Sequence, residues 1–478
     1  MSTARRIAKN TSILSISQII SYVLIFFYTI YIARFLGADG FGIISFALAF
    51  SGIFSIFVDL GLSVLTVREV SRDKSLEKKY LGNVLLIKII LAFLTFGLIA
   101  LFVNLIGYPH ETIVVVYFVS ISTILASLSG IFYSIFQAFE EMEYQSLGQI
   151  LNSILMFCGI LLGISLGFNV SGFSFIYLLS SFITLIFILF IYIWKFSSFK
   201  IEIDLSFWKQ TLKEALPYGI AGIFSTIYYW IDSVMLSIMV GNEIVGWYNA
   251  AYKIIYFFLS FYTLLIISIF PVMSTFYKTS HKSLKFAFER LFKYLLIISV
   301  PIAVITTLLS TRIILFMYSE GYIQSIIALQ ILIWTIIFMF INGLAGNLLG
   351  SVNKQLIVTK ITGFGAISNI LLNIILIPKF SYVGASFATV ITEFILMPIL
   401  IYVMWKSGYT NLKPLIKDLP KIIFSSLVMS LFVIYLNSLN LFLLILIASI
   451  TYFGTILITK TLDDEDILIL KSIIKKVS

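Results

Sequence analysis

The chain has 478 residues, of which 60% are hydrophobic and only 11% carry a charged side chain, and its mean hydropathy is +1.08. Soluble proteins contain roughly 25% charged residues, so this composition excludes a water-soluble protein and predicts an all-α polytopic membrane protein. The net charge of +10 first suggests a nucleic-acid partner, but its distribution along the chain points to the membrane surface instead.

Apolar stretches of about 17 to 25 residues predict fourteen membrane-spanning helices. In chain order they lie near 13–33, 41–64, 82–106, 113–137, 147–167, 173–194, 216–239, 247–270, 294–318, 327–351, 361–377, 385–404, 422–437 and 441–459. The first stretch follows three basic residues, as the apolar region of a signal peptide does. No small-residue cleavage site follows it, so we expect an uncleaved anchor.

The distribution of Lys and Arg residues predicts how the chain is oriented in the membrane. If the N-terminus is cytoplasmic, 27 of the 32 Lys and Arg residues fall in inner segments, three in outer loops and two inside spans. This distribution follows the positive-inside rule and predicts a protein of the cell membrane with both termini in the cytoplasm. The positive excess then faces anionic lipid headgroups, and no nucleic-acid partner is expected.

The connecting segments leave no room for a catalytic domain. The outer loops have at most about eight residues, and no segment contains a nucleotide-binding motif. The single cysteine, Cys158, lies in an apolar run, and His110 and His281 lie in separate loops, so no metal site is predicted. We expect a protein that is not an enzyme, has no cofactor, and uses the membrane potential, H⁺ or Na⁺ to drive transport.

Segment 195–215 is the longest connection between helices in the first half of the chain, and it is amphipathic. Trp208 and Leu212 recur at helical spacing, with Lys209 on another face, which predicts a short helix on the inner leaflet. Pro217 suits the first turn of the seventh span. The segment is interpreted as a cytoplasmic linker between two lobes.

Weak internal similarity supports this division. With a shift of 204 residues, the motif Gly37-x-Asp39-x-x-Gly42 lies over Gly241-x-Glu243-x-x-Gly246. Both motifs connect the first two spans of their half, which indicates two repeats of the same sense, related by a pseudo-two-fold axis along the membrane normal.

The predicted domains follow from these two observations. A six-helix lobe at 1–194 and a second at 216–404 flank the linker, and two extra helices occupy 405–459. A cytoplasmic amphipathic tail at 460–478 begins with four acidic residues and ends with basic ones, as expected for a surface helix whose charges complement its dipole.

Ionisable residues inside spans are the candidate functional groups, because each costs about 2.5 to 3.5 kcal/mol at the centre of a bilayer. Asp232 in span seven and Lys253 in span eight lie at similar distances from Glu243 at the turn, so a helical hairpin would place them side by side. An ion pair that only fixes helix packing and a site for an anionic headgroup are both compatible with this pattern.

Further polar residues flank this pair. Tyr229 precedes Asp232 by about one turn, and Asn249 and Tyr252 flank Lys253, which predicts a polar stripe on each helix.

A functional role is less well supported for the other charged residues within or near the spans. Glu393 has no nearby base in the sequence and is a candidate proton or cation site. Asp59, near the inner end of span two, is another ion-coupling candidate, although a base such as Arg68 would neutralise it. Lys88 and Arg34 lie within two turns of helix ends, so their side chains are expected to reach the interface.

Several stretches resemble the oligosaccharide flippases of polysaccharide biosynthesis. This family belongs to the multidrug/oligosaccharidyl-lipid/polysaccharide exporter superfamily, which also contains multidrug extruders and lipid II flippases. The residues that carry the resemblance are Ala33-Arg-Phe-Leu-Gly-Ala-Asp-Gly-Phe-Gly42, Asp59-Leu-Gly-Leu62 with Arg68-Glu69, Tyr229-Trp-Ile-Asp232, Val245-Gly-Trp-Tyr-Asn-Ala-Ala-Tyr-Lys253, Phe270-Pro271 and Val383-Gly-Ala-Ser386.

The resemblance implies two six-helix bundles around a V-shaped cavity lined by spans one, two, seven and eight. It also implies a lipid-linked oligosaccharide that passes from the inner to the outer leaflet, with Lys253, Asp232 and, from span one, Arg34 at the cavity. We expect the chain to act as a monomer, in contact with membrane lipids and with other proteins of polysaccharide assembly.

Two other functions remain open. A multidrug exporter of the same fold, coupled to Na⁺ or H⁺, would need acidic residues without basic neighbours, and span one contains no acid. A membrane glycan polymerase or glycosyltransferase would need a large outer loop with carboxylates, which the short loops do not offer.

Overall fold

The computed structural model describes residues 3–196, 203–466 and 468, and over these residues the chain is helical, with no β-strand. A helix satisfies every backbone hydrogen bond within its own segment, which a chain in lipid requires. The helices are α1 (Thr3–Asp59), α2 (Leu62–Arg72), α3 (Glu77–Ile106), α4 (His110–Ala138), α5 (Met142–Ser165), α6 (Val170–Phe196), α7 (Leu205–Met239), α8 (Asn242–Thr279), α9 (His281–Tyr318), α10 (Ser325–Leu332), α11 (Thr335–Ser351), α12 (Gln355–Lys406), α13 (Leu412–Lys417), α14 (Leu419–Tyr435) and α15 (Leu441–Ile458).

Eleven of these helices are long and apolar enough to cross a membrane, and a twelfth span results if α10 and α11, which meet at 41°, are taken together. The predicted multi-pass α-helical fold is therefore confirmed. The number of fourteen spans is not confirmed by this count and stays a prediction.

Two of the helices each contain a break where the sequence predicts an outer loop. In α1 the break is at Gly37, with φ of 70°, and in α12 it is at Ser381, with φ of 55°. Because a positive φ is incompatible with continuous right-handed helix, each break lets the chain reverse direction between two helical segments.

The predicted linker is only partly a separate segment. Residues 197–202 lie outside the described part of the chain, and α7 then runs without interruption from Leu205 to Met239. Pro217 therefore lies inside a long helix, not in its first turn as predicted. The Asp204 side chain accepts a hydrogen bond from the Phe207 backbone N–H and caps the helix at its true start.

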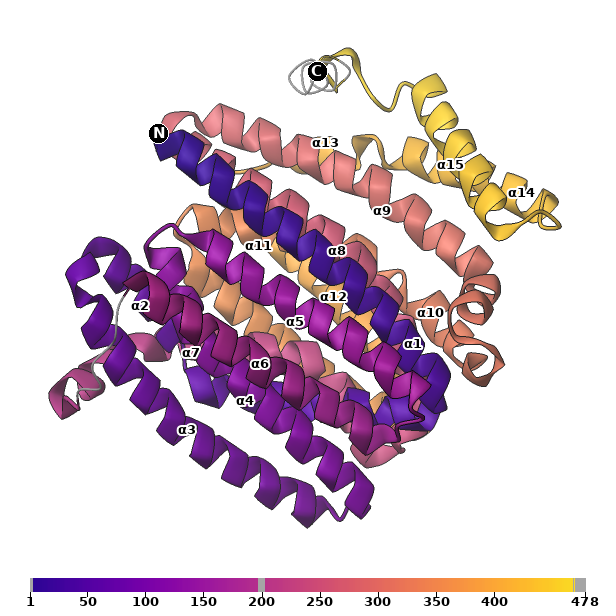
Figure 1. Ribbon diagram of the computed structural model, residues 1–478. Coiled ribbons are helices and arrows are strands. Elements are labelled where there is room, and N and C mark those ends of the chain that lie inside the picture. The colour runs from indigo at the N-terminus through magenta and orange to yellow at the C-terminus, as the bar shows by residue number, and fades with distance from the viewer. Residues whose placement is uncertain (1–2, 197–202, 467, 469–478) are drawn as a thin grey trace. The chain divides into compact units, whose positions relative to one another are not determined.

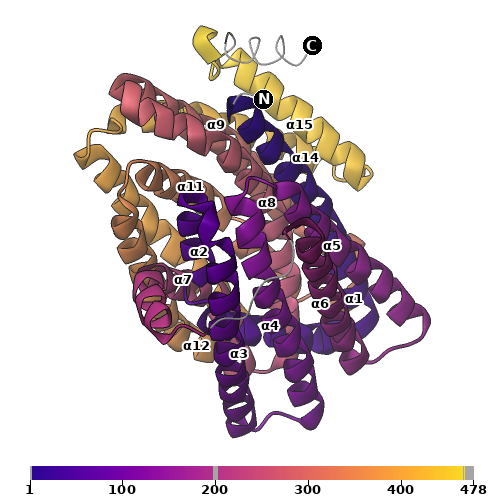
Figure 2. The same cartoon turned by 60° about the vertical axis from the view of Figure 1, so that its left-hand side comes forward.

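By packing, the chain divides into two units, one of residues 1–260 and 362–388 and the other of residues 261–361 and 389–478. In the first unit, α4 packs on α6, α1 packs on α4 and α5, and α7 packs on α1 and α2 (Figure 1). In the second unit, α9 contacts α10, α11, α14 and α15 (Figure 2). The predicted lobes and extra helices stay a prediction.

Polar contacts attach α14 and α15 to α9 in the second unit. The Tyr452 hydroxyl donates to the Ile297 carbonyl at 2.9 Å. Arg312 donates to the carbonyls of Leu439 and Asn437 in the loop between the two helices. Arg312 therefore joins α9 to the loop that connects α14 and α15.

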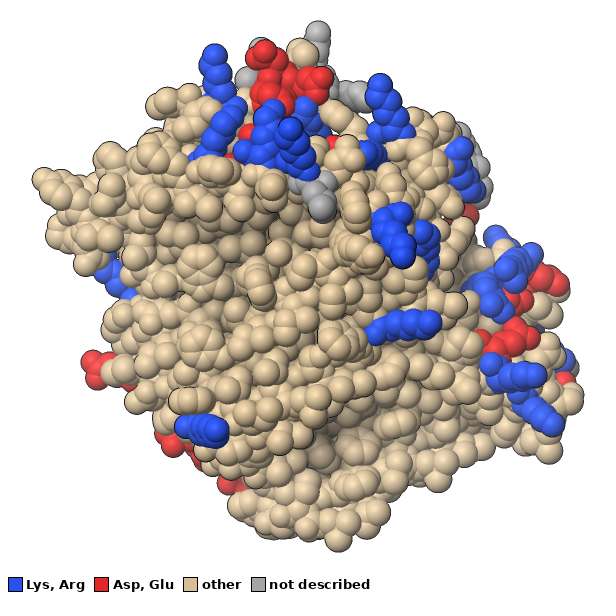
Figure 3. Space-filling view, turned by 180° about the vertical axis from the view of Figure 1, so that it is seen from behind, with Lys and Arg blue, Asp and Glu red and all other residues tan. Residues whose placement is uncertain are grey.

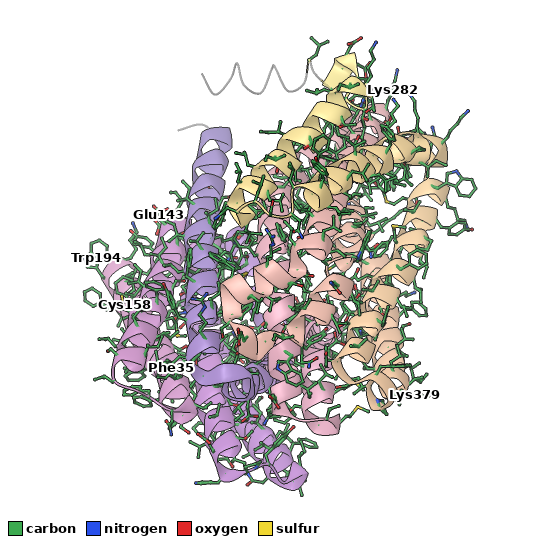
Figure 4. The ribbon with its side chains drawn as sticks, turned by 90° about the vertical axis from the view of Figure 1, so that its right-hand side faces the viewer. Phe35, Glu143, Cys158, Trp194, Lys282 and Lys379 are labelled. Atoms are coloured by element: carbon green, nitrogen blue, oxygen red, sulfur yellow. The ribbon has the colours of Figure 1, made fainter. Side chains whose placement is uncertain are left out.

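The surface has the composition of one that contacts lipid. Most of the face in Figure 3 is uncharged, and in the first unit the charged side chains gather where α2 ends and where α3 and α7 begin. In Figure 4, Phe35, Cys158 and Trp194 lie on the outer surface of this unit, and Trp194 is 70% exposed. Residues 66–80 and 203–215 thus contribute to one charged end, where ion pairs join Arg68 to Glu214 and Lys79 to Asp204.

Candidate functional site

The candidate site is built on the hairpin of α7 and α8. The turn lies at Val240 and Gly241, where Gly241 has φ of 129°, a value that favours glycine. Asn249 Nδ2 donates to Ser233 Oγ at 3.0 Å, and Ser237 Oγ donates to Asn242 Oδ1 at 2.6 Å. These contacts set the register of the two helices.

Asp232 is 5% exposed and lies in a network of neutral polar groups. Its carboxylate accepts hydrogen bonds from the Tyr248 hydroxyl at 2.8 Å and from Asn373 Nδ2 at 2.5 Å. Asn373 Nδ2 also contacts Asn369 Oδ1 at 3.0 Å. All four residues belong to the first unit, so α12 brings to the site two amides that the sequence alone did not indicate.

The predicted pairing of Asp232 with Lys253 is wrong. Among the described residues, no ion pair joins the two side chains, and the Lys253 Nζ lies 5.6 Å from the centre of the Tyr256 ring. The depths were counted from Glu243, but the chain turns at Val240 and Gly241. Asp232 is eight residues before this turn and Lys253 is twelve after it, a difference in depth of about 6 Å.

Four tyrosine rings form a chain beside Lys253. The Tyr256 ring lies 4.9 Å from that of Tyr229 and 4.6 Å from that of Tyr252, and the Tyr252 ring lies 5.5 Å from that of Tyr248. A cation over an aromatic face is attracted by the ring quadrupole. Lys253 thus has an aromatic neighbour that orients its ammonium group without neutralising it.

A small pocket lies between the two helices. Its volume of about 10 Å³ corresponds to about one water molecule. The lining residues are Tyr229, Trp230, Asp232, Ser233, Tyr248, Asn249, Tyr252 and Tyr256. The predicted residues Tyr229, Asp232, Asn249 and Tyr252 therefore converge on one place, and Tyr229, which is 45% exposed, also reaches the surface.

The oxygen atoms near Asp232 have the chemistry of a site for a hard cation. Carboxylate and amide oxygens are the ligands that such cations prefer. Asn373 Oδ1 is buried without a hydrogen-bond partner, and Asn369 Oδ1 lies beside it. No group of three or more His, Cys, Asp or Glu side chains with metal-binding geometry occurs in the described part of the chain, so a transition-metal site is not indicated there.

The structure contradicts two expectations, that the Lys88 side chain reaches the membrane interface and that Arg68 neutralises Asp59. Lys88 is fully buried, and its Nζ lies 2.6 Å from Asp59 Oδ1, so it does not reach the membrane interface. Its helix, α3, starts at Glu77 instead of at residue 82, which places Lys88 about one turn deeper than expected. Asp59 is neutralised by Lys88, and Arg68 contacts Glu69 and Glu214 instead.

The two remaining candidates lie on other helices, α1 and α12. Arg34 is exposed on α1, three residues before the break at Gly37. Glu393 is 4% exposed in the second unit, where its Oε2 accepts a hydrogen bond from Asn342 Nδ2 at 2.7 Å. Their roles stay predictions.

The chain is similar to known proteins in sequence and in fold. Residues 7–277 match the family model described as polysaccharide biosynthesis protein, and residues 217–375 match the MatE model. The chain is 29% identical to the uncharacterized membrane protein MJ1068 of Methanocaldococcus jannaschii over 283 residues, which is 57% of this chain. This alignment spans 55% of MJ1068, so the chain matches about half the length of that relative.

Solved structures show the same fold. The lipid II flippase MurJ in an inward closed conformation is similar with a TM-score of 0.76 and 22% identity, over 92% of this chain and 97% of MurJ. An inward-facing multidrug resistance MATE family transporter has a TM-score of 0.67 and 16% identity, over 81% and 95%. A MOP superfamily transporter from Pyrococcus furiosus has a TM-score of 0.61 and 18% identity, over 84% and 98%.

Proposed function

This chain belongs to the polysaccharide biosynthesis protein family, and we propose that it is a flippase that moves a lipid-linked oligosaccharide from the inner to the outer leaflet of the cell membrane. The cargo is an oligosaccharide on a polyprenyl phosphate or diphosphate carrier. Two lobes alternately expose a cationic cavity to each side while the lipid tail stays in the bilayer. The chain acts as a monomer, without catalysis, beside other proteins of polysaccharide assembly.

The observation that carries this proposal is Lys253 within the cluster of tyrosine rings. Its ammonium group has a neutral aromatic neighbour, Tyr256, and no ion pair among the described residues. A cation in this setting attracts an anionic phosphate, and exposed rings such as Tyr229 offer flat surfaces on which sugars stack. Arg34 on α1 is proposed as a second contact for the headgroup.

The membrane potential supplies a driving force for this direction of transport. A diphosphate of charge about −2 that moves outward across an inside-negative membrane gains roughly 4.6 kcal/mol per 100 mV, from about 2.3 kcal/mol per unit charge. No ATP hydrolysis by the chain is required. We further propose that Na⁺ or H⁺ binds at Asp232 and its amide neighbours, with Glu393 as a second candidate coupling group and Asp59 less favoured, because Lys88 neutralises it.

A cation-coupled multidrug exporter is the second candidate. It is favoured by the match of residues 217–375 to the MatE model and by the buried Asp232, a carboxylate within a membrane span that accepts hydrogen bonds from Tyr248 and Asn373. A membrane glycan polymerase is a weaker third candidate, because the sequence offers no large outer loop with carboxylates.

The proposal is tested by reconstitution into proteoliposomes loaded with a fluorescent lipid-linked oligosaccharide. We expect the wild-type protein to move the label between leaflets and Lys253→Ala to lose most of this activity, while Lys253→Arg keeps part of it. Lys379→Ala, which removes an exposed lysine in the same unit, is the matched control. Equal transport by wild type and Lys253→Ala would refute the site, and extrusion of cationic dyes without movement of lipid would favour the exporter.

A further inference from the structure

The two turns that carry the repeated glycine motif touch each other through their backbones. A Cβ added to Gly42 would lie 1.8 Å from the carbonyl oxygen of Asn242, and one added to Gly246 would lie 1.9 Å from that of Ala38. Real Cβ atoms essentially never come within 3.0 Å of another heavy atom. The backbones therefore approach this closely only because both positions lack a side chain.

This contact is reciprocal. The shift of 204 residues that relates the repeats converts Gly42 into Gly246 and Ala38 into Asn242. The same contact is thus made twice, with the roles of the repeats exchanged, as in an isologous interface around a local two-fold axis. Both contacts lie within the first unit.

The two glycines of each motif have different structural roles. Gly37 and Gly241 have φ of 70° and 129°, and a Cβ on either would meet nothing within 4 Å, so these positions shape the turn. Gly42 and Gly246 have ordinary helical backbones, and their lack of a side chain permits the close contact. Beside them, Val245 is completely buried, whereas Glu243, two residues away, is exposed.

We propose that the pair Gly42 and Gly246 is the outer gate of the transport cycle, closed in this structure, and that the two backbone contacts separate together when cargo leaves on the outer side. This inference rests on the proposed transport function and on the predicted orientation. A contact between backbones contains no side chain that can rearrange. It is therefore either made or broken, as a two-state gate requires.

The first test measures the gate without any cargo. Spin labels at Asp39→Cys and Glu243→Cys, in a background that carries Cys158→Ser, report the separation of the two turns. In Gly42→Ala and in Gly246→Ala the added Cβ must move from 1.8 or 1.9 Å to at least 3.0 Å from the opposing oxygen. We expect the distances between the labels to shift to longer values in both variants.

The matched control is Gly97→Ala, because a Cβ on this helical glycine meets nothing within 4 Å. We expect its label distances to equal those of the parent. If Gly42→Ala and Gly246→Ala elute as folded protein and keep the parent distances, the gate proposal is wrong.

A second test keeps both glycines, in case their substitution prevents folding. Val245→Cys and Glu243→Cys, each in the Cys158→Ser background, are exposed to a membrane-impermeant thiol reagent from outside. We expect labelling of residue 245 to be slower than that of residue 243 by on the order of tenfold, yet to reach completion as the gate opens. Equal rates, or no labelling of residue 245 at all, would overturn the gate.

Both tests report on the gate alone. If the distances and labelling change as expected but the protein moves no lipid-linked oligosaccharide, the gate proposal stands and the proposed cargo is wrong. If the protein moves the lipid but shows none of these changes, the proposed cargo stands and the gate proposal is wrong.

Discussion

Lys88 and Asp59 form an ion pair between α3 and the end of α1, with 2.6 Å between Nζ and Oδ1; Lys88 is fully buried and Asp59 is partly buried. The ammonium group also contacts Ser63 Oγ at 3.0 Å and the Ser127 carbonyl at 2.9 Å. Its three hydrogens thus have three acceptors. Asp59 is the last residue of α1, where the helix dipole disfavours a carboxylate, so Lys88 compensates an unfavourable charge.

Lys88→Ala is expected to destabilise the protein by about 3 kcal/mol, the lower end for a broken buried pair, because it leaves the Asp59 carboxylate, whose side chain is 23% exposed, without its partner. Replacing both residues, with Lys88→Met and Asp59→Leu, is expected to restore most of the loss, since no uncompensated charge then remains. Unfolding in detergent measures both effects. A double variant as unstable as Lys88→Ala would contradict this account.

Asp232→Asn is expected to abolish the dependence of transport on a Na⁺ or H⁺ gradient, because the amide cannot supply the negative charge that holds a cation. Tyr248→Phe removes a hydrogen bond to this carboxylate, at a cost of about 1 kcal/mol, but keeps its charge, and is expected to keep the dependence. Transport into proteoliposomes with imposed gradients distinguishes the variants. A gradient response that survives Asp232→Asn would show that another group is responsible.

Tyr256→Leu is expected to raise the KM for the lipid-linked cargo by several-fold, because a cation over an aromatic ring is stabilised by about 0.5–2 kcal/mol and the ring positions Lys253. Tyr256→Phe keeps the ring and is expected to transport almost as wild type does. Flipping rates as a function of cargo density give both constants. An equal rise in KM for the two variants would assign the effect to the hydroxyl instead.

Acid is expected to loosen the segment that follows α15. Burial alone would raise the pKa of Asp463, but hydrogen bonds from Arg290 and the Asp466 backbone, together with the charge on Lys293, lower it to about 2. Because this value is below the ordinary 3.8, the carboxylate stabilises the fold above about pH 4 and loses this contribution as the pH falls toward 2.

The comparison of wild type with Asp463→Asn tests this expectation. The variant should be less stable above pH 4, and the difference should shrink as the pH falls toward 2. Thermal unfolding in detergent over this range is the measurement. A difference that does not change with pH would mean that the ion pair with Arg290 contributes nothing measurable.

Much of the fold follows from properties of single segments. A long apolar run predicts a helix, because the requirement for internal hydrogen bonds applies to each segment regardless of its neighbours. The breaks at Gly37 and Ser381 fall in the predicted outer loops, because each loop separates two apolar runs. The convergence of Tyr229, Asn249 and Tyr252 on one pocket was also predictable from their spacing on two adjacent helices.

The sequence by itself thus determined the membrane class, the helical segments and the repeated glycine motif, because hydropathy and local turns depend on neighbours along the chain. Only the tertiary structure decided that Asp232 binds Tyr248 and Asn373, and that Lys88 binds Asp59. These partners depend on the position of the turn and on how helices distant in sequence pack. A shift of a few residues in register changes every partner across a helix pair while the helices themselves stay the same.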